Sequence, residues 1–285
     1  MVDNKDLFQN TLKANVSFSG IGLFTGEKVN ISIFPAKEDS GIVFRRIDLP
    51  EKPMFPAKLE NVKETDRTTF LGFGKKSIQT VEHILSALRA FNIDNAYVEV
   101  DGAEIPIGDG SANVFVKLFQ EAGIERQSKK AEILKLVEPL YFNEQHVHII
   151  ALPSDEFRIS FAIHHPTSDL LKSQYYSFLV QKDLYIQDIA SSRTYSIYEE
   201  IEPLLKNNLM KGGSLENAVI IKAGKVMNPE GMRFPNEMVR HKVLDMIGDL
   251  SLIGNRFTAH IIAVRSGHYA NILFAKKLIH QLKKS

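Results

Sequence analysis

A polar stretch at residues 125–132, Glu-Arg-Gln-Ser-Lys-Lys-Ala-Glu, lies between two longer segments that each carry apolar patterns of their own. A run of this kind buries little apolar surface, which is typical of a connection between folding units. At about 100–200 residues per domain, a chain of 285 residues has room for two units with separate cores. We therefore expect a linker here, with one domain at residues 1–126 and another at residues 132–285.

Both parts contain strand-length apolar segments together with longer segments of helical spacing. In the first part, strands are expected at residues 31–34, 41–44 and 96–100, and helices at residues 80–91 and 111–123. In the second part, strands are expected at residues 133–142, 147–152, 157–163 and 218–221, and helices from residue 186 onward, at residues 236–252 and at residues 269–283. Strands and helices grouped in this way predict an α+β fold of two similar halves.

Composition excludes several classes of function. The absence of Cys excludes disulfides, thiolate nucleophiles and Cys-ligated metals, so His, Asp and Glu remain as the strong metal ligands. The formal net charge of +1 provides no overall field to attract nucleic acid. No apolar run exceeds four residues, far short of the roughly 20 that cross a bilayer. The N-terminus shows no secretory signal, and we expect a cytoplasmic location.

The segment Gly20-Ile-Gly-Leu-Phe-Thr-Gly26 superficially resembles a dinucleotide-binding fingerprint. Its sixth position is Thr25, however, and no helical pattern follows, so we interpret the segment as a hairpin turn. The sequence has no Walker lysine loop, no Gly-x-Ser-x-Gly elbow and no His-Glu-x-x-His motif. Nucleotide-hydrolase and serine-hydrolase interpretations therefore lose most of their support.

The expected helix at residues 236–252 carries three reactive side chains on one face. At about 100° per residue, His241, Asp245 and Asp249 lie roughly 80° apart at most, away from the helix's apolar stripe. His241 and Asp245, at positions i and i+4, can reach one metal ion together. Gly248 on the same side indicates a close approach by another segment. A solvated polar face explains the pattern equally well.

A second helix at residues 80–91 places Thr80 at the N-cap and Glu82 and His83 in the first turn. His83 points almost opposite the apolar stripe of this helix. The first turn favours a carboxylate or a bound anion, because its backbone N–H groups are unpaired. The ordinary interpretation is that Glu82 suits the helix dipole and that His83 lies at the surface.

Taken together, the two helices supply His83, His241 and Asp245, which form the ligand set of a catalytic zinc site with one position open to water. Iron(II) satisfies the same ligands. Glu82, beside one ligand, is then a candidate general base, and Asp249 a residue that orients a histidine ring. Spacing alone does not show that the two helices meet.

The other histidines give weaker indications. His268 follows the apolar segment 261–264 in a loop, where as a cation it could stabilise an oxyanion or protonate a leaving amine. A lone loop histidine is more often inert. His146 and His148 share one strand face but have no accompanying carboxylates, so we interpret them as surface residues.

Seven segments of the chain, in order, are similar to the bacterial UDP-3-O-acyl-N-acetylglucosamine deacetylases (the LpxC family), zinc amidases of lipid A synthesis. The segments are Gly20–Gly26, Thr80–His83, Glu104–Ser111, Ser192–Thr194, Gly212–Ser214, Arg240–Leu250 and Ser266–His268. The resemblance implies that His83, His241 and Asp245 bind zinc and that Glu82 is the general base. It further implies that Thr194 donates to the oxyanion, that His268 is the acid or electrostatic stabiliser tuned by Asp249, and that Lys242 contacts the substrate.

The resemblance also implies a fold and a substrate. The fold is two β-α-α-β domains with the sheets outside and the helices packed between them. The substrate is a UDP-glucosamine with a 3-O-linked hydroxyacyl chain, whose 2-acetamido group is hydrolysed to acetate and a free amine. An apolar acyl passage is expected around residues 195–219, although its residues would serve equally well in a core. The substrate-binding residues implied are Tyr195, Ile197, Met210, Gly213 and Arg265.

Four positions depart from the family's usual pattern. Arg265 stands where lysine is frequent, Tyr195 where phenylalanine is common, Met210 where a smaller residue occurs and Ile163 where an aromatic often lies. These changes bear on nucleotide affinity and acyl-chain length rather than on the reaction.

Two other functions stay open: another metal-dependent amidohydrolase on the same scaffold, and a non-enzymatic binding protein, against which Glu82 argues because binding needs no base. We expect a monomer. The Lys-rich tail at residues 276–284 could touch a membrane surface transiently, although a solvated C-terminal helix is the more ordinary explanation.

Overall fold

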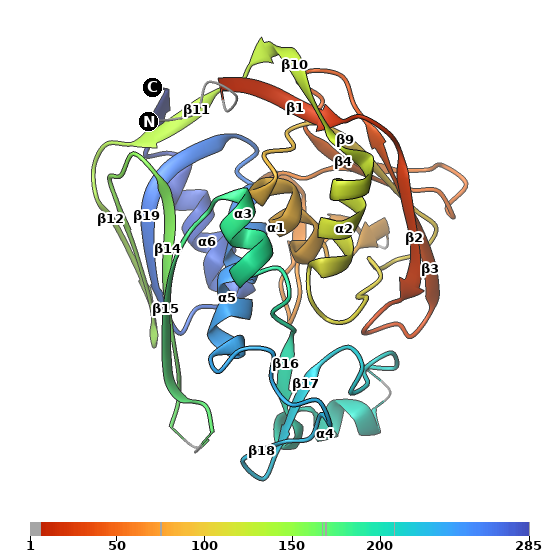
Figure 1. Ribbon diagram of the computed structural model, residues 1–285, viewed down its shortest axis with the longest axis vertical. Helices are drawn as coiled ribbons and strands as arrows, with labels where there is room; N and C mark the ends of the chain where they lie inside the picture. The colour runs from red at the N-terminus through yellow and green to blue at the C-terminus, as the bar shows by residue number, and fades with distance from the viewer. Residues whose placement is uncertain (1–6, 75, 167, 169, 208, 285) are drawn as a thin grey trace.

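The computed structural model describes residues 7–74, 76–166, 168, 170–207 and 209–284. Two large β-sheets form opposite sides of the molecule, and helices α1, α2, α3, α5 and α6 lie between them (Figure 1). Buried apolar side chains from both sheets and from these helices form one continuous core. The chain therefore has a mixed α+β fold, as the sequence predicts.

The helices described are α1 (Glu82–Ala90), α2 (Asn113–Ala122), α3 (Lys182–Asp188), α4 (Tyr198–Lys206), α5 (Glu237–Ser251) and α6 (His268–Leu278). α5 differs from an ordinary amphipathic surface helix, because it packs against α1, α6 and the second large sheet at once. Its polar face is consequently covered as well as its apolar stripe, and both His241 and Asp245 are buried.

The first large sheet has five strands, in the order β2-β3-β9-β4-β5. Their bounds are β2 (Val16–Ile21), β3 (Lys28–Pro35), β9 (Ala96–Val100), β4 (Ile42–Arg46) and β5 (Met54–Pro56). Along β3, Val29, Ile31 and Ile33 are buried in alternation, which gives this sheet one face toward the helices. β2 and β3 are antiparallel neighbours joined through residues 22–27, so the hairpin expected at Gly20–Gly26 is confirmed.

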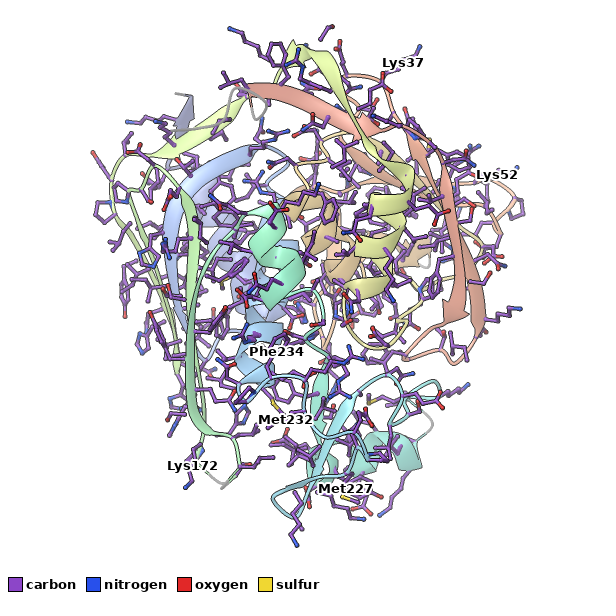
Figure 2. All side chains as sticks on the ribbon, in the orientation of Figure 1. Lys37, Lys52, Lys172, Met227, Met232 and Phe234 are labelled. Carbon is purple, nitrogen blue, oxygen red and sulfur yellow. The ribbon has the colours of Figure 1, made fainter. Side chains whose placement is uncertain are left out.

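The second large sheet has seven strands, of which β19 is central because it pairs with β11, β13 and β14. Their bounds are β11 (Ile133–Leu136), β12 (Leu140–Glu144), β13 (Val147–Leu152), β14 (Phe157–His165), β15 (Lys172–Leu179), β19 (Arg256–Val264) and β20 (Leu282–Lys284). Lys172 lies at the tip of the β14–β15 hairpin (Figure 2).

Three small sheets complete the fold. Their strands are β1 (Phe8–Leu12) with β10 (Ile124–Lys130), β6 (Val62–Glu64) with β7 (Phe70–Phe73) and β8 (Lys76–Ile78), and β16 (Tyr195–Ile197) with β17 (Val219–Lys222) and β18 (Lys225–Val226). A 3₁₀ turn at Leu59–Asn61 precedes β6. The β16–β18 sheet and α4 project at one end of the molecule, and Met227, Met232 and Phe234 lie along the chain that returns from them to α5 (Figures 1 and 2).

Several sequence expectations need correction. Residues 125–130 are not an irregular linker, because they belong to β10, which pairs with β1. The strand expected at residues 133–142 is two strands, β11 and β12, separated at residues 137–139, where Pro139 has no N–H to donate. The helix expected from residue 186 onward lies mostly before that point, as α3, and ends at Asp188.

Two helix ends also differ from expectation. Thr80 is not the N-cap of α1, since its φ is +63° and its hydroxyl donates to Glu104 Oε1 at 3.1 Å. The C-terminal helix ends at Leu278, and the tail continues as β20, antiparallel to β11. Leu278 and Leu282 are both buried, so these apolar side chains are not available to a membrane surface. No helix in the described residues combines the length and apolarity that a bilayer crossing requires.

Candidate metal and catalytic site

Helices α1 and α5 meet at Gly248, which spacing alone could not show. A Cβ added to Gly248 would lie 2.1 Å from the backbone oxygen of Glu82, so any side chain there would force the helices apart. The close approach brings the rings of His83 and His241 to a centroid distance of 5.0 Å in an edge-to-face arrangement. The segment that Gly248 was expected to admit is therefore the first turn of α1.

Gly248→Ala is expected to destabilise the fold, although alanine is the better helix former by about 1 kcal/mol. Overpacking costs about 1–3 kcal/mol, and because the obstructing atom is backbone it cannot turn aside as a side chain would. Denaturant unfolding measures the effect, with Gly267→Ala for comparison, because a Cβ at Gly267 meets no atom of the described residues within 4 Å. Equal stability of the two variants would contradict the close packing.

Three side chains on these helices form a buried cluster suited to a metal ion. Candidate ligand atoms of His83, His241 and Asp245 all lie within 4.8 Å of one another. Nε2 of His83 and Nε2 of His241 lie 3.9 Å and 3.3 Å from Asp245 Oδ1. The three residues are only 4%, 2% and 3% exposed. Nδ1 of His241 donates to the Ser192 carbonyl at 3.0 Å, which leaves its Nε2 as the free donor atom for a cation.

The protonation states of this cluster also suit a cation. Burial lowers the pKa of His83 to about 3 and lowers that of His241 below its usual value, so both rings are neutral. Burial alone would raise the pKa of Asp245, but the positive charges of Lys242 and His268 outweigh it and keep the carboxylate ionised. Among the described residues, Asp245 Oδ1 and His83 Nδ1 have no hydrogen-bond partner. Buried polar atoms of this kind are costly unless something binds them, and a divalent cation at the cluster would satisfy the carboxylate.

Glu82 lies in the same cavity and is held by two donors. The Thr68 hydroxyl donates to its Oε1 at 2.6 Å and the Thr69 backbone N–H to its Oε2 at 3.1 Å. Burial raises the pKa of Glu82 to about 7, although His268, whose Nε2 lies 3.7 Å away, acts in the opposite direction. A carboxylate with a pKa near neutrality is suited to accept a proton and release it again.

His268 begins α6 and lies against Asp249. Its Nδ1 donates to Asp249 Oδ2 at 2.9 Å. Burial would lower the pKa of His268, but the carboxylates of Asp249 and Glu82 raise it to about 10, so the ring carries a positive charge near neutral pH. A charged imidazole facing the cavity can stabilise an oxyanion or donate a proton.

Lys242 of α5 and Thr194, which directly precedes β16, also line the cavity. Lys242 Nζ donates to Asp245 Oδ2 at 2.8 Å; burial opposes its charge, but Asp245 raises its pKa above the ordinary value. Thr194 is fixed through its backbone, since its N–H donates to Gly110 and its carbonyl accepts from Val219. The preceding Arg193 is buried and paired with the buried Glu237 at 2.8 Å, which anchors this segment to the start of α5.

The cavity has a volume of about 200 Å³ and one apolar wall. The wall consists of Leu23, Phe24, Ile107 and Met210. A neighbouring hollow of about 370 Å³ is lined by Arg265 and shares Tyr195 and Lys242 with the cavity.

Most of the site residues expected from the sequence therefore lie together: Glu82, His83, Thr194, Tyr195, Met210, His241, Lys242, Asp245 and His268 line the cavity, and Asp249 lies behind His268. Ile197 and Gly213 do not line it. Ile197 packs against the main core, and Gly213 lies along a groove with Lys117 and Lys211. His148 pairs with Tyr141 on the second sheet, and His146 is exposed.

Sequence reasoning missed the polar residues behind the site, chiefly Thr68, Thr69 and Asn271. Thr68 and Thr69 stand in a polar segment without periodicity, so no pattern marks them. Asn271 could have been found, because on a helix that starts at His268 it lies one turn later on the same face.

Comparison with known proteins agrees with this geometry. The family profile of UDP-3-O-acyl N-acetylglycosamine deacetylase matches residues 9–280. The chain is 45% identical over 275 residues to the UDP-3-O-acyl-N-acetylglucosamine deacetylase of Chlamydia abortus, covering 96% of this chain and 98% of that protein. It is 44% identical to the protein of that name from Chlamydia pneumoniae, with coverage of 96% and 98%, and 41% identical to that from Chlamydia trachomatis serovar L2, with coverage of 96% and 96%.

Proposed function

Because the chain belongs to the UDP-3-O-acyl-N-acetylglucosamine deacetylase family, we propose that it hydrolyses the 2-acetamido group of UDP-3-O-(hydroxyacyl)-N-acetylglucosamine in lipid A biosynthesis, releasing acetate. The observation that carries this proposal is the position of Glu82, which lines one cavity with His83, His241 and Asp245. A ligand cluster beside a carboxylate of near-neutral pKa has the parts needed to cleave an amide with water.

His83, His241 and Asp245 would hold the metal, zinc in this proposal, with iron(II) as the alternative. When bound, the ion supplies Lewis-acid polarisation of the amide carbonyl and of the attacking water. Glu82 accepts the proton of that water, and Thr194 donates a hydrogen bond to the developing oxyanion. His268, oriented by Asp249, stabilises negative charge or protonates the leaving nitrogen, and Lys242 contacts the substrate.

The neighbouring surfaces suit the two ends of such a substrate. Arg265 in the adjoining hollow carries a charge for the phosphates of UDP, with Tyr195 between the hollow and the cavity. The acyl chain is assigned to the apolar wall that includes Met210 and is continued by Ile201 and Leu204 of α4. Ile197 and Gly213 stay predictions from the family resemblance, with no cavity contact to support them.

The finer architecture belongs to the same proposal. We assign residues 1–126 and 132–285 to two similar β-α-α-β domains, each with its sheet outward and its helices inward. The placement of α1 and α5 side by side between the two large sheets supports this assignment. The cytoplasmic location, the monomeric state and any transient membrane contact stay predictions.

The experiment that tests the function is acetate release from the acylated UDP-sugar, coupled to an assay of bound metal. We expect turnover of this compound and little or none of simple N-acetylated sugars, because the hollow and the apolar wall contact parts that those sugars lack. Equal turnover of both would favour the alternative, another metal-dependent amidohydrolase on this scaffold.

Arg265→Gln is expected to raise KM for the UDP-sugar by about tenfold while kcat stays within about twofold, since a lost hydrogen bond to a charged group is worth about 1.5–3 kcal/mol. Steady-state kinetics measure both constants. Arg158→Gln, on β14 with an exposed partner Glu156, serves as the control with no expected change. A fall in kcat with constant KM would contradict the assignment of Arg265 to binding.

A further inference from the structure

Two adjacent threonines contact two buried carboxylates of the site. One is Glu82, and the other is Asp249, which orients His268. Thr68 and Thr69 donate to the two oxygens of Glu82, through the Thr68 hydroxyl and the Thr69 backbone N–H. The Thr69 hydroxyl donates to Asp249 Oδ1 at 2.7 Å. One dipeptide therefore connects the first turn of α1 with the last turns of α5.

The directions of these hydrogen bonds are determined by chemistry. The Thr68 hydroxyl donates to Glu82 and the Thr69 hydroxyl to Asp249, the direction that a carboxylate requires when it is ionised and only accepts. The other oxygen of Asp249 accepts from His268 Nδ1 at 2.9 Å and from Asn271 Nδ2 at 2.8 Å. Asn271 is itself oriented by Ser266, whose hydroxyl donates to its Oδ1 at 2.5 Å. The orientation of the Asp249 carboxylate is therefore fixed by donors at both of its oxygens. The orientation of the His268 ring depends in turn on this carboxylate.

Burial and backbone pairing also restrain the position of the Thr68-Thr69 dipeptide. Thr68 and Thr69 are 1% and 0% exposed, so solvent does not compete for their hydroxyls. They follow Arg67, whose backbone is in the left-handed region at a φ of +63°, and they precede β7, which pairs with both β6 and β8. The pairing of β7 with β6 and β8 therefore holds the backbone of the two threonines in place.

We propose that Thr68-Thr69 is a positioning element for the reaction, holding Glu82 and the Asp249–His268 pair at a fixed separation across the cavity. The proposal rests on the function proposed above, which assigns roles to Glu82 and His268. Neither threonine belongs to the ligand cluster or lines the cavity, so both act through Glu82 and Asp249. Their removal should impair chemistry without impairing metal or substrate binding.

Thr69→Val tests this, because valine keeps the shape of threonine but not its hydroxyl. We expect kcat to fall by about 10–100-fold, the usual cost of losing an outer hydrogen-bond partner, with KM within about twofold and metal content unchanged. Thr69→Ser, which restores the hydroxyl, should recover kcat to within about threefold of the original. Thr68→Val should resemble Thr69→Val. Thr258→Val is the matched control, since the Thr258 hydroxyl is buried without a hydrogen-bond partner in the part of the chain that the structure describes.

A second readout separates this proposal from the proposed function. The ring N–H of His268 that donates to Asp249 should give a low-field proton resonance, assigned by its loss in His268→Gln, and Thr69→Val should shift it whether or not the substrate is correct. An unshifted resonance, or kcat unchanged in Thr69→Val, overturns the proposal. So does failure of Thr69→Ser to recover kcat, which would indicate a purely structural role.

If Thr69→Val does not fold, Thr69→Ala gives the same comparison. Absence of acetate release by the unaltered protein would instead overturn the proposed function.

Discussion

Glu82→Gln is expected to lower kcat for acetate release by about 10²–10⁴-fold, the range that general acid–base catalysis contributes. Glutamine has the shape of glutamate and still accepts from the Thr68 hydroxyl, but it cannot take a proton from water. The pKa of about 7 that burial gives Glu82 allows the carboxylate to act near neutral pH. Steady-state kinetics with the acylated UDP-sugar measure the effect.

Bound metal should be unchanged in this variant, because Glu82 is not among the three residues of the ligand cluster. Glu64→Gln is the control: it alters an exposed carboxylate on nearby β6 and should leave kcat unchanged. Full turnover by Glu82→Gln would show that another group takes the proton.

His241→Ala and Asp245→Ala are each expected to remove bound metal and to reduce turnover to background. Either change leaves two ligands where a catalytic zinc site needs three, and Asp245→Ala also removes the negative charge that attracts the cation. Metal content after gel filtration, measured with acetate release, reports both effects.

His146→Ala provides a matched control, because it deletes an exposed imidazole in the turn between β12 and β13, away from the cluster. It should keep both metal and turnover. Equal loss of metal from all three variants would contradict the choice of ligands.

The two site-bearing helices could be predicted because their information is local. Helical spacing located α1 and α5 to within about two residues at each end, and an i, i+4 pair on a helix shares a face wherever the helix lies. Their meeting could not be predicted from spacing, because it depends on a contact between Gly248 and Glu82, which are far apart in sequence; only the family resemblance implied it.

The burial of His83 illustrates the same limit. Its position opposite the apolar stripe of α1 allowed a surface interpretation, yet the side chain is only 4% exposed because α5 covers that face. A single helix shows which of its faces is apolar but not which neighbour covers its polar face. Only the ligand set that the two helices form together indicates a partner for the polar face of α1.

Polar strands were missed for a related reason. β10 and β20 are held by backbone pairing with β1 and β11, and most of the β10 side chains are exposed. Their sequences consequently lack the alternation that marks a half-buried strand. A polar segment can therefore read as a linker or a tail when a distant partner strand makes it part of a sheet.

The pairing of β1 with β10 has a mechanical consequence. β10 connects the two halves of the chain and pairs with β1. Arg256 of β19 donates to the Phe8 carbonyl of β1 and to Asp94, so it joins the second large sheet to β1 and to the first half of the chain. Separating the two halves of the molecule would require breaking the β1–β10 pairing or the Arg256 hydrogen bonds. Ligands are therefore expected to enter the cavity between α1 and α5 without any separation of the two large sheets.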